Sequence, residues 1–143
     1  MLSIDLFFGN YFRAIYFKQR IRERQANMVV TSLNSVTKTK VDMEGAAGVI
    51  KQLPIGSADG APNFSFRVFT VSPGGHTPYH QHESEHVNYV ISGKGVLVKG
   101  EKTENPIQQG DFCLVAPYET HQFQNRSKED DLVIICAVMK QYE

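Results

Sequence analysis

The sequence predicts an all-β protein whose short strands pack into a sandwich or a closed barrel. From Val36 onward, short apolar runs are separated by Gly, Pro, Asn and Asp, and no window has the length and period of a convincing helix. The runs recur at regular spacing, which is typical of sandwiches and barrels. A length of 143 residues suits one domain with one core. We therefore expect a single domain over residues 36–143 with one functional site.

The clearest strand pattern runs over residues 63–71, where apolar side chains alternate. Alternation places Phe66 and Val68 on one face and Arg67 on the other. The glycine-rich segment Pro73-Gly74-Gly75 is expected to end this strand. Further strands are expected between turn segments, of which Glu104-Asn105-Pro106 is one: residues 87–91, 96–99, 112–116, 122–124 and 132–139.

Residues 1–35 are expected to form an N-terminal extension outside the barrel. An aromatic run between Phe7 and Phe17 is followed by basic residues from Lys18 to Arg24, and acidic residues are scarce. An amphipathic interfacial helix and an organelle-targeting segment both fit this pattern. The alternatives are a disordered tail and translation that starts at Met28.

Charge and hydropathy restrict the classes of partner. Basic and acidic residues number 15 each, so no charge excess points to nucleic acid. The apolar segment from Leu6 to Phe17 is interrupted by Asn10 and Arg13 and is too short for a membrane span. Cys113 and Cys136 lie in apolar stretches, which favours buried free thiols in a reducing compartment. We expect a cytoplasmic protein with a small-molecule ligand, no nucleic-acid partner and no integral membrane span.

Four of the five histidines fall between positions 76 and 86. In an extended chain His80 and His82 point to the same face, so that two imidazoles reach one ion. His86 has the same parity and returns to that face if residues 83–85 make a tight turn. His121 is the available fourth donor from elsewhere in the fold. The spacing predicts one divalent metal ion on His80, His82, His86 and His121, with His76 as a surface or hydrogen-bonded residue.

These residues resemble the two motifs of the RmlC-like cupin superfamily. Motif 1 corresponds to residues 74–93, with His86 at the position where the family has glutamate, and motif 2 corresponds to residues 110–125. The resemblance extends over residues 63–139 and is closest to small single-domain cupins of type 2 with a four-histidine site. The matching positions are Gly74, His80, His82 and Gly93 in the first motif, and Gly110, Pro117, His121 and Asn125 in the second.

The resemblance implies a conical barrel, also described as a double-stranded β-helix or jelly roll, made of two antiparallel sheets. The metal is then expected inside the barrel near its open end. A homodimer paired through edge strands is also implied, since such pairing covers those edges.

Replacing glutamate by His86 changes the expected chemistry of the ion. Four neutral imidazoles leave both positive charges of the metal in place, which makes it a stronger Lewis acid and favours anionic ligands. Nitrogen ligation suits transition metals rather than calcium or magnesium. We expect manganese or iron, with zinc, nickel and copper as alternatives.

Around the ion we expect a mostly apolar wall. Phe66 and Val68, or their neighbours on the opposite face of the strand, are candidates for it. Glu119 is either a carboxylate that orients an imidazole or a solvent-facing group. Cys136 is either a reactive thiol at the cavity or an inert core residue.

The function expected from this site is that of a metalloenzyme, an oxidoreductase of dioxygenase type that acts on a small organic substrate. Four protein ligands on an octahedral ion leave two adjacent positions for substrate and dioxygen. A Lewis-acid isomerase and a non-catalytic binding module are the alternatives, since a fold does not determine a function.

Overall fold

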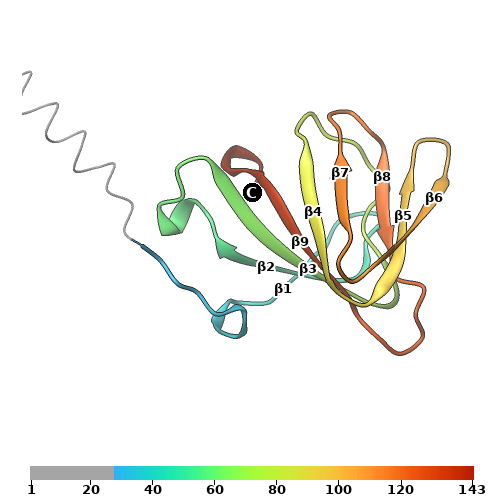
Figure 1. The fold of residues 1–143 in the computed structure, drawn as a ribbon, viewed down its shortest axis with the longest axis horizontal. Helices are drawn as coiled ribbons and strands as arrows, with labels where there is room; N and C mark the ends of the chain where they lie inside the picture. Colours follow the sequence, from blue (N-terminus) through green and yellow to red (C-terminus); the bar gives the residue numbers. More distant parts are fainter. Residues whose placement is uncertain (1–27) are drawn as a thin grey trace, which may run out of the picture.

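The computed structural model describes residues 28–143, so residues 1–27 of the expected N-terminal extension lie outside the described part of the chain. The expectation of an all-β fold is confirmed, because the described residues form strands and three single turns of 3-10 helix (Figure 1). Within these residues the structure contains no helix with the length and apolar character that a membrane crossing requires. The elements are η1 (Leu33–Ser35), β1 (Thr39–Lys40), β2 (Ala47–Ile55), η2 (Ser57–Asp59), β3 (Phe64–His76), β4 (His86–Ser92), β5 (Lys94–Lys99), β6 (Thr103–Gln108), β7 (Phe112–Val115), β8 (His121–Gln124), β9 (Leu132–Met139) and η3 (Lys140–Tyr142).

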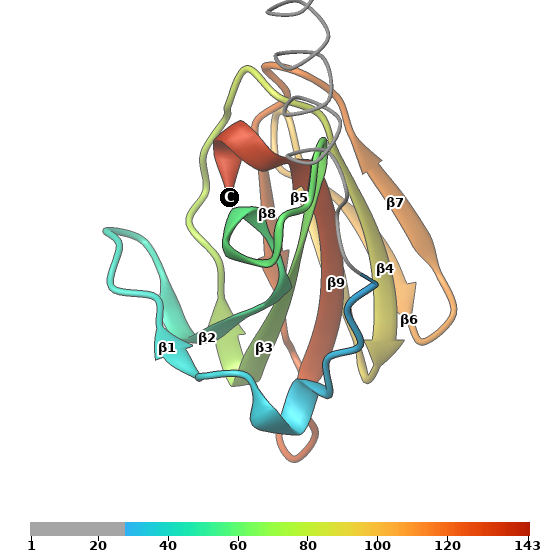
Figure 2. The same ribbon diagram turned by 90° about the vertical axis from the view of Figure 1, so that its left-hand side faces the viewer.

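The strands form a curled antiparallel sheet in the order β6-β5-β8-β3-β9-β4-β7, with β2 on β3 and β1 on β2. One half of the barrel contains β9, β4 and β7, the other half contains β8, β5 and β6, and strand β3 belongs to both. Its residues 64–71 pair with β9, whereas His76 at its end pairs with Gln124 of β8. Figures 1 and 2 show the two halves facing each other across the interior. The expected barrel of antiparallel sheets is therefore confirmed.

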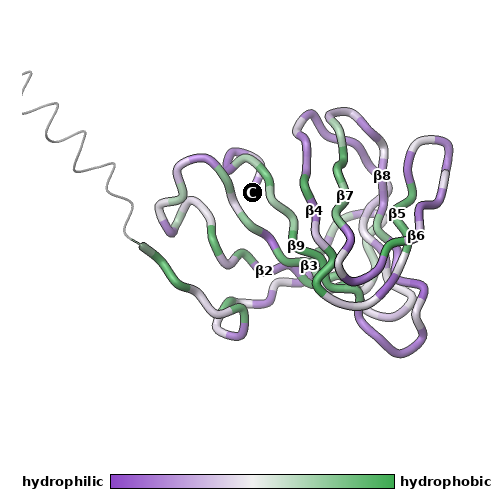
Figure 3. Tube along the Cα trace, in the orientation of Figure 1, coloured by the Kyte–Doolittle hydropathy of each residue, from purple (hydrophilic) through white to green (hydrophobic). Residues whose placement is uncertain are grey.

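The core lies between the two halves and is built from alternate strand residues. Val71, Val90 and Leu132 are fully buried, and Ile134 is 1% exposed. The register places Ile134 of β9 between Phe69 of β3 and Val90 of β4, so one row of side chains crosses the sheet. Hydrophobic residues concentrate along these strands (Figure 3). Burial of this row holds the halves together.

The segment Pro73-Gly74-Gly75 does not end β3, so that prediction was wrong. The strand continues to His76, and its pairing with β2 shifts register between Ala47 and Val49. Gly74 has a φ of 72°, and a Cβ at Gly75 would lie 2.6 Å from the carbonyl oxygen of Ala47. These glycines therefore form a bulge that bends the strand without ending it.

Three strands were not predicted: the short β1, β2 and β6. Strand β6 contains Asn105 and Pro106, which we expected in a turn. It stands at the end of the strand order, where the missing N–H of a proline is tolerated. Strand β2 also contains a proline, Pro54, close to its second register shift.

The outer face of β4 and β7 carries exposed apolar side chains. Val87 is paired with Leu114, and these residues are 47% and 63% exposed. Phe112, which lies on β7 with Leu114, is 76% exposed, and its ring contacts that of Tyr89 on β4. The homodimer implied by the family resemblance stays a prediction.

Substituting Ile134 by alanine should lower the free energy of unfolding by about 2–5 kcal/mol, because it removes buried methylenes and leaves a cavity. Leu114→Ala serves as the control, since this side chain is mostly exposed, and should change stability by about 0.5 kcal/mol or less. Urea unfolding followed by circular dichroism measures both. Equal losses in the two variants would contradict the assignment of the core.

Candidate metal centre

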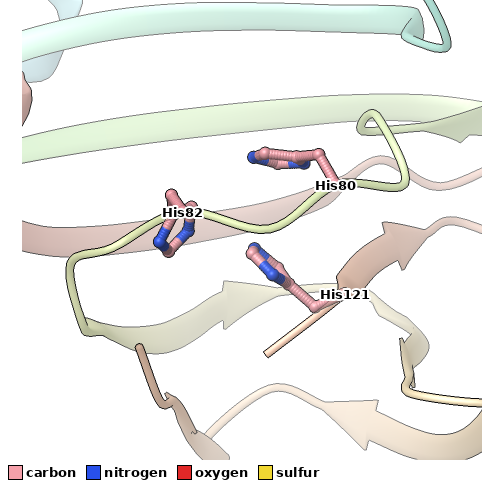
Figure 4. A group of neighbouring side chains, drawn as sticks. All are labelled: His80, His82 and His121. Atoms are coloured by element: carbon pink, nitrogen blue, oxygen red, sulfur yellow. The ribbon is translucent and has the colours of Figure 1, made fainter. Parts of the chain in front are cut away.

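Three histidines from two distant segments of the chain meet at one end of the cavity between the halves of the barrel. His80 and His82 lie in the segment between β3 and β4, and His121 begins β8. One ring nitrogen from each lies within 4.8 Å of the other two (Figure 4). The side chain of His121 is buried, and the other two are half-buried. This spacing suits a single cation shared by three imidazoles.

Backbone pairing fixes two of the three rings. The N–H of His80 donates to the carbonyl of His121 at 3.2 Å, and the N–H of His121 donates to the carbonyl of His80 at 2.9 Å. Residues directly opposite each other in an antiparallel pair point to the same face. His82 is held by a further bond, since its carbonyl accepts the N–H of Tyr118 at 2.7 Å.

A common hydrogen-bond pattern sets the tautomer of all three rings. Each Nδ1 faces a backbone carbonyl two residues away, so Nδ1 carries the proton and Nε2 keeps its lone pair. Nε2 of His82 is buried and has no hydrogen-bond partner among the described residues. An orphaned, buried lone pair of this kind fits a metal ion. The Nδ1 to carbonyl distances are 3.0 Å from His80 to Pro78, 2.6 Å from His82 to Ser84 and 2.9 Å from His121 to Glu119.

Burial also favours the neutral form of His82 and His121. It lowers the pKa of His82 and of His121 from the ordinary histidine value, and the neighbouring imidazoles act in the same direction. A neutral imidazole is the form that binds a metal. The described residues therefore supply three prepared nitrogen donors.

His86 lies beside this group with a different set of contacts. Its ring stacks on that of His82, with centroids 3.7 Å apart and an angle of 27° between the planes. Nε2 of His86 is 3.3 Å from Oγ of Ser84 and 3.4 Å from a terminal nitrogen of Arg67. Burial, together with the charge of Arg67 and the neighbouring imidazoles, lowers the pKa of His86 to about 3. The fourth ligand position stays a prediction.

His76 and Glu119 lie outside the group of three nitrogen donors. Nδ1 of His76 is 3.0 Å from the carbonyl of Gly45 and 3.2 Å from the side-chain amide of Gln122. The carbonyl of Glu119, rather than its carboxylate, orients His121. The Glu119 carboxylate accepts the N–H of Ala116 at 3.4 Å instead.

A cavity of about 390 Å³ adjoins the histidines. Its volume falls within the roughly 300–1,000 Å³ of small-molecule sites. Cys136 lines this cavity, whereas Phe66 and Val68 do not. From β3 the wall takes the alternate residues Arg67 and Phe69, because successive side chains of a strand point to opposite faces.

Sequence reasoning did not single out Lys51 and Asn88 of this wall, and it included Arg67 only as a neighbour on the opposite face of the strand. A signal existed for Arg67 and Asn88, since each is a polar residue in an otherwise apolar predicted strand. Asn88 lies two residues after His86 on β4, so its side chain is expected to point into the barrel as well. Lys51 could not be found in this way, because β2 itself was not predicted.

The two thiols should be unreactive in the native protein. Burial raises the pKa of Cys113 and of Cys136, and the side chains are 8% and 2% exposed. Since the thiolate is the nucleophile, we expect iodoacetamide at pH 7.5 to alkylate both about 100-fold more slowly than in urea. Mass spectrometry of the time course measures this. Fast labelling of native Cys136 would instead identify a reactive thiol at the cavity.

Comparisons with known proteins agree with the barrel fold described above. The family model of the cupin domain matches residues 67–138. The polyketide cyclase RemF from Streptomyces resistomycificus is 27% identical and superimposes with a TM-score of 0.74, over 79% of this chain and 80% of that one. A cupin-2 domain protein from Rhodospirillum rubrum is 20% identical, with a TM-score of 0.67 over 80% and 76% of the two chains. It supports the fold alone.

Among curated proteins, auxin-binding protein 4 of Zea mays is 29% identical over 79 residues. The match takes in 50% of this chain but only 39% of the relative's length. The family model spans half of the chain, including the strands that carry His86 and His121. By sequence and by architecture, this chain belongs to the cupin family.

Proposed function

We propose that this protein is a metal-dependent enzyme that binds one divalent transition metal on His80, His82, His86 and His121 and oxidises a small organic substrate with dioxygen. The observation that carries the proposal is the shared orientation of three imidazoles. Each directs Nδ1 to a backbone carbonyl and leaves Nε2 free, and one ring nitrogen from each lies within 4.8 Å of the other two. Surface histidines have no need of such an arrangement.

His86 is proposed as the fourth ligand through rotation of its side chain. It begins β4 with the same parity as Asn88, which lines the cavity, and its ring already contacts that of His82. Rotation would exchange its contacts with Ser84 and Arg67 for a bond to the ion. The burial that keeps His86 neutral favours this exchange.

A ligand set made only of imidazole nitrogen suits iron, copper, nickel and zinc. For the proposed reaction with dioxygen the ion must be redox-active, and we propose iron or manganese. The bound ion would supply Lewis acidity and open coordination positions for the substrate and for dioxygen. The surroundings of the ion come from the protein's own apolar side chains. Phe69, Phe123 and Ile134 line the cavity next to the histidines and would exclude water from it.

A second candidate is Lewis-acid catalysis without dioxygen. It is favoured by the likeness to a polyketide cyclase, which extends over about four fifths of both chains at 27% identity. Zinc or nickel would serve this chemistry as well as iron does. Bound zinc or nickel would therefore favour the second candidate, whereas bound iron is compatible with both.

His82→Ala and His121→Ala should each lose most of the bound metal, because each removes one prepared nitrogen donor. His76→Ala is the matched control and should retain it, since His76 contacts Gly45 and Gln122 instead. Plasma mass spectrometry of protein purified without a metal-binding tag measures about one equivalent of metal in the wild type. Equal loss in all three variants would contradict the ligand assignment, and zinc or nickel in the wild type would favour the second candidate.

Iron(II)-loaded protein should bind nitric oxide, a substitute for dioxygen, because an octahedral ion with four protein ligands keeps two positions open. Electron paramagnetic resonance would detect the paramagnetic adduct. His121→Ala, loaded in the same way, is the control for adventitious iron. If the wild type gives no signal although iron is bound, the site is closed to dioxygen and the oxygenase proposal fails.

A further inference from the structure

Arg67 is a buried cation whose donors are only partly used. The residue is 9% exposed, and its guanidinium lies inside the cavity wall. One terminal nitrogen donates to Sγ of Cys136 at 3.0 Å and the other to the carbonyl of Tyr142 at 3.2 Å. Nε has no partner among the described residues. A buried charge with an unused donor is costly unless an anion pairs with it.

The described residues offer no such anion to Arg67, since their one ion pair joins Arg126 to Glu104 on the surface. Glu143 is the acidic residue among those that line the cavity. Its carboxylate is already engaged, because it accepts the N–H of Ser57 at 2.9 Å and the hydroxyl of Ser65.

Lys51 brings a second positive charge to the same wall. It lies on β2, opposite Phe69 of β3, and lines the cavity together with Arg67. Burial lowers the pKa of Lys51, and the charge of Arg67 lowers it further, while the charge of Glu143 acts in the opposite direction. Two cations that repel each other in a partly desolvated wall favour binding of an anion between them.

The remaining walls define the body of the ligand. Val49, Phe69, Phe123 and Ile134 are apolar and line the same space. The guanidinium of Arg67 lies 5.4 Å from the ring centroid of Phe69. An anionic group at the two cations would therefore continue into an apolar or aromatic skeleton.

We propose that Arg67 and Lys51 form a carboxylate-binding subsite next to the histidine cluster, and that the ligand is a small organic acid with an apolar or aromatic body. The guanidinium fork matches a carboxylate, with Nε and a terminal nitrogen as paired donors. Arg67 approaches His86 to 3.4 Å, and the His86 ring stacks on His82. An acid held there would present its body to the histidines. The role of this acid as a substrate rests on the proposed function, but its binding does not require the metal.

The test uses 2-naphthoate and its neutral analogue 2-naphthamide as probes of metal-free protein at pH 7, measured by isothermal titration calorimetry. We expect the acid to bind at least tenfold more tightly than the amide, which corresponds to about 1.4 kcal/mol. Arg67→Met should abolish this preference and Lys51→Met should reduce it. Arg126→Met removes an exposed arginine and is the matched control, which should keep the full preference.

Equal affinity of the wild type for acid and amide would overturn the subsite, as would an unchanged preference in Arg67→Met. If Arg67→Met does not fold by circular dichroism, Lys51→Met decides, and an unchanged preference there overturns the proposal. Metal analysis separates this result from the proposed function. A preference for the acid in a protein that takes up no metal would leave the subsite standing and defeat the metalloenzyme. Bound metal without a preference for the acid would support the metalloenzyme and overturn the subsite.

Discussion

The two backbone hydrogen bonds between His80 and His121 are the interaction on which the site depends. They join the segment after β3 to the start of β8 and so close one half of the barrel on the other. Thr77 extends this seam, because its N–H donates to the carbonyl of Phe123 and its hydroxyl accepts the N–H of Phe123. The seam brings together His80 and His121, which are 41 residues apart in the sequence. Without it His80 and His82 would form a pair of donors with no third partner.

The sequence was sufficient for the fold class and for the arrangement of the histidine pair, because both follow from local periodicity. Any extended segment places His80 and His82 on one face, and their ring nitrogens do converge in the structure, although the segment between β3 and β4 is not a strand. The end of β3 could not be determined in this way. Pro73-Gly74-Gly75 has the composition of a turn, but pairing with β2 keeps it extended as a bulge. Asn105 and Pro106 were misread for a related reason, since only the strand order shows that β6 is at an edge.

Ring orientation in the site depends on tertiary contacts that no sequence pattern displays. The parity of His86 directs it inward, but the direction of its ring is set by Ser84 from the preceding loop and by Arg67 from β3. The tautomers of the three other rings depend on backbone carbonyls of their own loops. Local geometry therefore prepares His80, His82 and His121, whereas His86 is held by a neighbour that carries a charge.

The positive charge of Arg67 lies between the metal centre and the proposed ligand site and affects both. Neutral imidazoles would leave the charge of a bound ion uncompensated, and Arg67 and Lys51 add two further positive charges to the same cavity, against one engaged carboxylate at Glu143. A guanidinium that is buried without a counter-charge is costly, and a carboxylate bound beside it would remove this cost. A neutral amide that fills the same apolar volume offers Nε of Arg67 a carbonyl acceptor but leaves the charge of the guanidinium uncompensated. Discrimination between acid and neutral compound thus arises mainly from the penalty for the wrong ligand, which is the way that buried polar groups achieve high specificity.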